Sequence, residues 1–130
     1  VNALMGMAVD WRARRARTGT PTAGFTGPAI KPVALRCVWQ AAQAVRIPVV
    51  GVGGIATVDD VLEFLVAGAS AVQVGSATFT RPDTMVRLVD DLARCLADEG
   101  LGAVSELVGT LRVADPAGGA GGPGEVTAGG

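Results

Sequence analysis

Residues 47–77 constrain the fold of this chain most, because they contain two short apolar strands separated by a stretch with helical spacing. The strands are predicted at Val49–Val52 and Ala71–Val74, and their apolar character is typical of strands buried on both faces of a parallel sheet. The intervening helix is predicted between Thr57 and Gly68. This β-α-β order predicts two parallel strands joined by a crossover helix.

Each of these strands runs into glycine directly before a helix. Gly53 and Gly54 follow the first strand, and Gly75 and Ser76 follow the second. Glycine lets main-chain N–H groups approach an anion closely, and the start of the next helix adds a favourable dipole. The alternative is that the glycines only form tight turns. Repetition of the pattern on consecutive β/α units favours a phosphate site, as barrel enzymes commonly build one after their seventh and eighth strands.

The other predicted elements are helices with an irregular segment before them. One helix is predicted from Pro32 to about Val45, a second at 82–99 with Gly100 ending it, and a short third at 104–111. The apolar stripe of the helix at 82–99 consists of Met85, Leu88, Val89, Leu92 and Leu96. Residues 4–25 are predicted to form a long irregular loop, which carries Trp11 as an anchor. Its four arginines (Arg12, Arg14, Arg15 and Arg17) favour a solvated loop or hairpin face over an anion-binding site.

Composition excludes several classes of function. The net charge of −1 provides no field that would attract nucleic acid or an acidic membrane, and no apolar run has the ~18–20 residues of a membrane span. The chain has no histidine, which excludes a Ser-His-Asp triad, a Cys-His pair and histidine-ligated zinc within it. Cys37 and Cys95 lie far apart, so we expect no disulfide, no metal site and a reducing cytoplasm.

The length of 130 residues is about half of what a β/α barrel needs, which is ~250 residues. We therefore expect an α/β fold that forms the C-terminal portion of a (β/α)₈ TIM barrel, contained in residues 1–112 of a longer protein. Residues 113–130 are rich in glycine and proline, and we expect them to be disordered.

Four sequence blocks, in order, resemble class 1 dihydroorotate dehydrogenases, particularly the type that pairs with an electron-transfer subunit. The blocks are Asn2–Met7, Thr26–Leu35, Pro48–Ile55 and Gly68–Gly75. The resemblance implies an FMN-binding barrel that oxidises dihydroorotate to orotate in pyrimidine biosynthesis. It also implies a partner subunit that carries FAD and an iron–sulfur cluster, and we expect an oligomer.

Position by position, the resemblance implies a cofactor site and part of a substrate site. FMN would be contacted by Val1 and Gly27, and its phosphate would be bound by the main chain of Gly53, Gly54, Gly75 and Ser76. The substrate would contact Asn2 and Ala3, although Ala3 stands where the family usually has threonine or serine. The catalytic base of the family comes from earlier strands, so no catalytic residue is expected in this chain.

Two alternatives remain open at this point. One is a related FMN barrel, such as the pyrimidine-reducing domain of dihydropyrimidine dehydrogenase. The other is a non-catalytic half-barrel that binds phosphate or flavin.

Some reactive side chains have simpler interpretations. Cys37, Cys95 and Trp39 are predicted to pack against neighbouring helices or strands, and Asp59 and Asp60 to stabilise the start of a helix. Lys31 is predicted to be a solvated lysine near a helix start.

Overall fold

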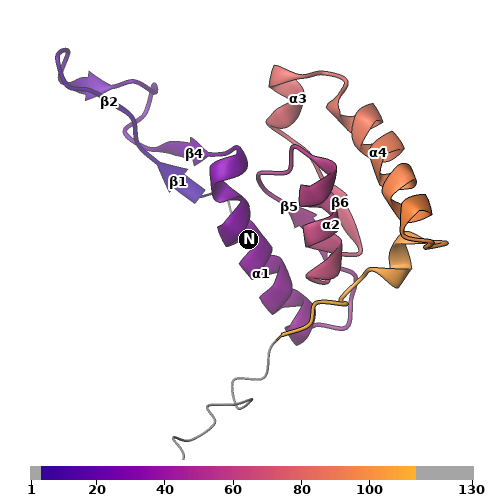
Figure 1. The fold of residues 1–130 in the computed structure, drawn as a ribbon. Coiled ribbons are helices and arrows are strands. Elements are labelled where there is room, and N and C mark those ends of the chain that lie inside the picture. Colours follow the sequence, from indigo (N-terminus) through magenta and orange to yellow (C-terminus); the bar gives the residue numbers. More distant parts are fainter. Residues whose placement is uncertain (1–3, 114–130) are drawn as a thin grey trace, which may run out of the picture.

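A parallel pair of strands lies at the centre of the structure, a computed structural model that describes residues 4–113 (Figure 1). β5 (Val50–Val52) pairs with β6 (Ala71–Gln73), and Gly51 lies opposite Val72. α2 (Val58–Val66) connects the two strands. The β-α-β unit predicted from the sequence is therefore confirmed.

Two long helices pack beside this unit. α1 (Lys31–Ala44) contacts β5 and α2, while α4 (Thr84–Asp98) contacts α2 on its other side (Figure 1). Both helices lie close to their predicted positions. Three short elements complete this region: η1 (Pro28–Ile30), α3 (Ala77–Thr80) and η2 (Val104–Glu106). The helix start predicted after Gly75 and Ser76 is that of the short α3, which the sequence did not separate from the helix expected at 82–99. The helix expected at 104–111 is only the single turn of η2.

The core forms where α2 packs onto the strands. Phe64 and Leu65 are fully buried, and Val38 of α1 and Leu88 of α4 join them from the two flanking helices. Gly51 makes this packing possible, because a Cβ atom there would lie 2.6 Å from the Phe64 ring. A full-sized aromatic ring therefore rests directly on the main chain of β5.

The start of α2 is fixed by a reciprocal cap. The Thr57 hydroxyl accepts a hydrogen bond from the Asp60 N–H, and the Asp60 carboxylate accepts one from the Thr57 N–H. This capping box satisfies main-chain donors that the first helical turn leaves free. Thr57 is the N-cap residue of α2, and Asp60 stabilises the helix start as predicted.

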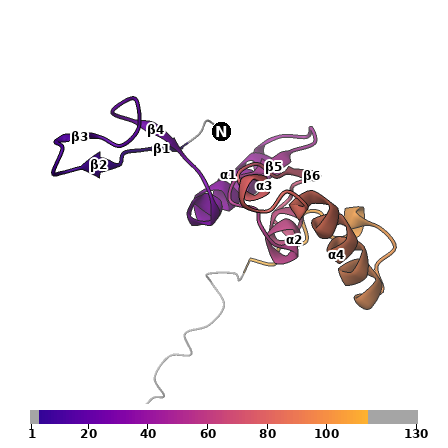
Figure 2. The same ribbon diagram turned by 90° about the horizontal axis from the view of Figure 1, so that it is seen from above.

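The segment before α1 is not the irregular loop that we expected. β1 (Leu4–Gly6) pairs antiparallel with β4 (Ala23–Phe25), and β2 (Val9–Asp10) pairs with β3 (Arg15–Ala16). The chain thus runs out and back as a ribbon that projects from the helical body, as seen from above in Figure 2. The Asp10 carboxylate accepts hydrogen bonds from the main chain of Arg12 and Ala13, which reverses the chain at the ribbon tip.

The prediction for Trp11 was also wrong. Its side chain is not an anchor but is 71% exposed at the ribbon tip, where the Arg12 guanidinium stacks over the ring at 4.5 Å. The arginines of the ribbon are exposed, as predicted. Trp39 is half-buried on α1, in agreement with its predicted packing role.

Two predictions of burial were wrong. Val50 and Val52 are about half exposed, because α1 and α2 cover the side of β5 on which Gly51 lies and no described element covers the other side. On α4, Leu88 faces the core, but Met85 and Val89 of the predicted stripe are exposed. In both cases the element carries more apolar side chains than the other elements of residues 4–113 cover. No helix in this part of the chain is long and apolar enough to cross a membrane.

Candidate functional site

A groove of about 380 Å³ lies between α1, β5 and the carboxyl ends of the two parallel strands. This volume is within the range of ~300–1,000 Å³ that is usual for small-molecule sites. All five described residues that the sequence assigned to cofactor binding line this one groove: Gly27, Gly53, Gly54, Gly75 and Ser76. Val1, Asn2 and Ala3 lie outside the described residues, so their assignments stay predictions.

Gly53 and Gly54 form the sharp turn after β5. Their φ angles are +128° and +75°, a region that side-chain-bearing residues rarely adopt. Neighbouring protein atoms also crowd both positions. A Cβ atom on Gly53 would lie 2.7 Å from Ala34 Cβ, and one on Gly54 would lie 2.8 Å from both the Gly27 carbonyl oxygen and the Lys31 nitrogen. The fold itself therefore requires glycine at both positions.

Gly75 and Gly27 differ from that pair. Among residues 4–113, no atom lies within 4 Å of the position that a Cβ atom on either residue would take. Gly75 also lacks the positive φ that would make glycine necessary for the backbone, whereas Gly27 has a φ of +97°. Packing and backbone strain thus leave glycine at Gly75 unexplained. A ligand that closely approaches the main chain there would explain it.

Ser76 follows Gly75 at the start of α3. Its hydroxyl makes no capping hydrogen bond with that helix, although Ser76 occupies the N-cap position. The Gly75 carbonyl oxygen, by contrast, accepts hydrogen bonds from the Thr78 main chain and hydroxyl at 3.0 and 2.8 Å, which fixes the turn. Ser76 can therefore offer its hydroxyl to a ligand in the groove.

The walls of the groove are mostly apolar. They come largely from one face of α1 and from β5, and this contribution of α1 was missed at the sequence level. The aliphatic residues and thiol on these two elements that line the groove are Val33, Ala34, Cys37, Val38, Ala41, Val50 and Val52. Cys37 fills a place in this wall, as its packing interpretation predicted. An apolar groove with a few polar groups at one end suits a flat aromatic ring attached to a phosphate.

Gln73 is a further groove residue that the sequence reasoning did not single out. It lies on β6, where it is the polar residue in an otherwise apolar strand, and its side chain is exposed. That break in the apolar pattern was the available signal. No charged side chain lines the groove among residues 4–113, so an anion there would be held by main-chain N–H groups and hydroxyls.

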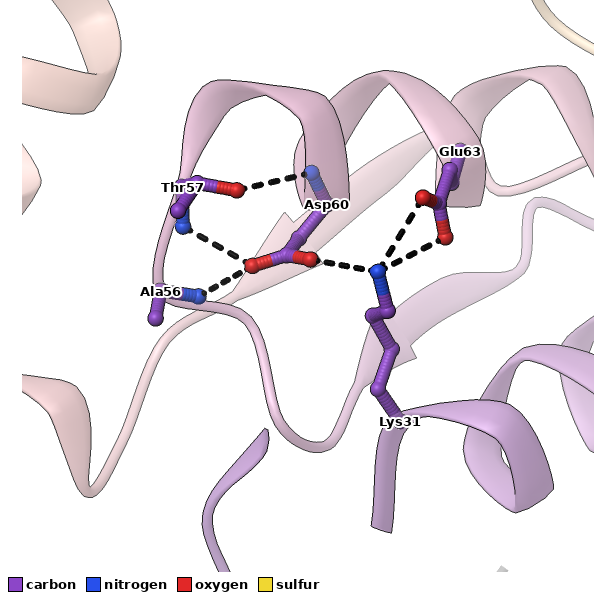
Figure 3. A network of polar contacts seen from close by, with 5 residues as sticks. All are labelled: Lys31, Ala56, Thr57, Asp60 and Glu63. Atoms are coloured by element: carbon purple, nitrogen blue, oxygen red, sulfur yellow. Dashed lines mark hydrogen bonds and ion pairs between the residues drawn. The ribbon is translucent and has the colours of Figure 1, made fainter. Parts of the chain in front are cut away.

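Behind the turns, Lys31 joins α1 to the start of α2 (Figure 3). Its ammonium group lies 2.6 Å from Asp60 Oδ1 and 2.9 Å from Glu63 Oε2. The Asp60 Oδ2 atom accepts hydrogen bonds from the N–H groups of Ala56 and Thr57, each at 2.9 Å. The prediction that Lys31 is simply solvated was therefore wrong, because its side chain is only 24% exposed and is held by two carboxylates.

These contacts shift both pKa values toward the charged forms. Burial alone would raise the pKa of Asp60, but the hydrogen bonds from Lys31, Ala56 and Thr57 outweigh it and lower the pKa from 3.8 to about 2. The hydrogen bonds that Lys31 donates to Asp60 and, with a smaller effect, to Glu63 raise the pKa of Lys31. The pair therefore stays ionised over the whole physiological range.

Comparison with known proteins identifies the family. The model of the dihydroorotate dehydrogenase family matches residues 1–96. The chain is 54% identical over 112 residues to a protein of Solibacter usitatus provisionally named dihydroorotate dehydrogenase A (fumarate). It is 51% identical over 113 residues to the catalytic subunit of dihydroorotate dehydrogenase B (NAD(+)) of Geobacter sulfurreducens.

The first match covers 86% of this chain and the second 87%, but each covers only 37% of the relative. The chain thus spans little more than a third of the curated relatives that it matches. A solved structure, the Eimeria tenella enzyme in complex with ferulenol, superimposes with a TM-score of 0.67 at 25% identity. That match covers 84% of this chain and 29% of the other. Sequence and structure agree that this chain belongs to the dihydroorotate dehydrogenase family.

Proposed function

We propose that this chain is the flavin-phosphate end of a dihydroorotate dehydrogenase that oxidises dihydroorotate to orotate in pyrimidine biosynthesis. The observation that carries the proposal is that Gly27, Gly53, Gly54, Gly75 and Ser76 converge on one groove. These residues come from three turns spread over 50 positions of the chain, and the two turns at 53–54 and 75–76 follow adjacent parallel strands. Ligands of α/β proteins bind at this end of the strands.

The residues fit FMN as the cofactor. The glycine turns and the Ser76 hydroxyl would hold its phosphate. FMN, when bound, supplies the acceptor for the hydride that leaves dihydroorotate. The chain's own part in the reaction is to bind and orient the cofactor, and we propose that the catalytic base lies outside this chain.

The wider architecture belongs to the same proposal. We propose that residues 1–112 form the C-terminal portion of a (β/α)₈ barrel. The exposed sides of Val50 and Val52 support this, since in a closed barrel such residues face the other strands. Residues 114–130 lie outside the description, so the expected disordered tail stays a prediction.

The names of the relatives support a proposal about the protein partners of this chain. The Geobacter relative is called a catalytic subunit, which favours a separate electron-transfer subunit here, with FAD and an iron–sulfur cluster as the resemblance implies. The Solibacter relative is named for fumarate, so the acceptor needs direct measurement. The oligomeric state and the cytoplasmic location stay predictions.

Gly75→Val in the full-length protein tests the site most cleanly. Among residues 4–113, no atom lies within 4 Å of a Cβ atom built at this position, and Gly75 has no positive φ, so we expect the variant to fold while the valine occupies the space next to the ligand. We expect most of the bound FMN to be lost, measured as flavin absorbance per mole of protein. Gly19→Val is the matched control, because its Cβ atom is equally unobstructed and lies away from the groove.

Two results would contradict the proposal. Equal FMN content in both variants and the native protein would refute the assignment of the phosphate site. Turnover of uracil with no oxidation of dihydroorotate would point instead to a related pyrimidine reductase.

A further inference from the structure

The Gly27 turn and the Gly53–Gly54 turn come from different parts of the chain, yet their main chains lie so close that no Cβ atom fits between them. The position that a Cβ atom on Gly54 would take is 2.8 Å from the Gly27 carbonyl oxygen and 2.8 Å from the Lys31 nitrogen. The Gly53–Gly54 turn thus packs directly against Lys31. Any movement of Lys31 would change the separation of the two turns that line the groove.

The side chain of Lys31 extends from the Gly53–Gly54 turn to the start of α2. Figure 3 shows its ammonium group between Asp60 and Glu63 at the start of α2. The same Asp60 carboxylate also holds the N–H groups of Ala56 and Thr57. Residues 53–57 are therefore fixed at one end by the Lys31 main chain and at the other by the Lys31 side chain through Asp60.

We propose that Lys31 is a positioning residue for the ligand's phosphate, acting through its ion pair with Asp60, which locks the Gly27 turn to the Gly53–Gly54 turn. This inference rests on the proposed function, since it takes the groove to be a phosphate site. Lys31 does not touch the ligand, because its ammonium group is already bound to Asp60 and Glu63 and Lys31 is not among the residues that line the groove. The lysine contributes geometry and not direct attraction of the anion.

The Asp60 contact dominates over the Glu63 contact. The Asp60 side chain is only 12% exposed, whereas the Glu63 side chain is 44% exposed, so water weakens the second ion pair more. Asp60 is also the residue that binds the loop. We therefore expect Glu63→Gln to have little effect on ligand binding, and Lys31→Met to have a large one.

The test compares FMN with riboflavin, which lacks the phosphate, in the full-length protein. Lys31→Met keeps most of the side-chain stem and removes the charge. We expect it to raise the Kd of FMN about tenfold, the loss expected when one charge-assisted hydrogen bond is misaligned, and to leave the Kd of riboflavin within about twofold. Arg94→Met is the matched control, because it removes one positive charge from an exposed ion pair on α4. It should change neither Kd.

If the role of Lys31 is merely structural, Lys31→Met should raise the Kd of FMN and of riboflavin by the same factor. That result would overturn the proposal. An unchanged FMN Kd in Lys31→Met would overturn it as well. If Lys31→Met does not fold, Lys31→Arg replaces it. The guanidinium is larger than the ammonium group and holds its donors in a planar fork, so we expect it to misalign the contact that Lys31 makes with Asp60 at 2.6 Å and to weaken the binding of FMN alone by at least about threefold. Native FMN affinity in Lys31→Arg would then refute the inference.

The proposed function fails in a different and recognisable way. If the native protein binds FMN and riboflavin equally, or binds neither, the groove is not a phosphate site at all. If the native protein prefers FMN and the Lys31 variants keep that preference, only the role of Lys31 is refuted.

Discussion

Asp60→Asn isolates the free energy that one buried carboxylate contributes to the stability of the protein. Asparagine has the shape of the protonated acid, so the substitution imitates protonation of Asp60 at any pH. The folded-state pKa of Asp60 is about 2, against 3.8 for the ordinary group. This difference corresponds to about 2 kcal/mol of stability at pH 7, and the side chain is sufficiently buried for most of that value to be retained.

The sign of the pH dependence follows from the lowered pKa. A carboxylate with a depressed folded-state pKa stabilises the native state above pH 3.8, and this contribution is lost as the pH falls toward 2. The difference in unfolding free energy between the native protein and Asp60→Asn should therefore be about 2 kcal/mol at pH 7. By pH 3 it should have fallen by about 1 kcal/mol.

Urea denaturation of the full-length protein, followed by circular dichroism at pH 7, 5, 4 and 3, measures this difference. Asp59→Asn is the matched control, since it removes the same charge one residue away in the same helical turn, from an exposed position. The control should change the unfolding free energy by less than about 0.5 kcal/mol. A difference for Asp60→Asn that stays constant from pH 7 to pH 3 would refute the argument, because it would show that the ion pair and the cap do not depend on the charge.

Two further predictions use the same denaturation assay. Phe64→Ala should lower the unfolding free energy by about 3–5 kcal/mol, because the ring is fully buried against Gly51; a loss below about 1 kcal/mol would contradict this packing. Gly54→Ala should be more destabilising than Gly100→Ala. Both residues have positive φ, which costs about 1–2 kcal/mol, but only Gly54 is also crowded by main-chain atoms, so equal losses would contradict the contact between the two turns.

Local sequence patterns were sufficient for the elements that their own residues stabilise. The apolar stretch at 49–52, the helix-starting Thr57 and the glycine stop at Gly68 all act within a few positions, through backbone preference and capping. The glycine turns were found for the same reason. Their repetition after two successive strands is visible without knowing how the chain folds.

The ribbon at residues 4–25 could not be predicted in this way. Its strands are only two or three residues long, and no apolar alternation marks them. They exist because a turn at Asp10 brings segments up to 21 positions apart into register, Leu4 opposite Phe25. Pairing over that distance is a tertiary property.

The sequence by itself therefore determined the β-α-β unit and which residues were candidates for a phosphate site. Only the tertiary structure showed how the glycines differ: protein atoms crowd Gly53 and Gly54, whereas Gly75 borders open space in the groove. It also determined the contacts of Lys31, whose partner Asp60 lies 29 positions further along the chain. Crowding, open space and ion pairing depend on atoms that are distant in sequence, and folding alone brings those atoms together.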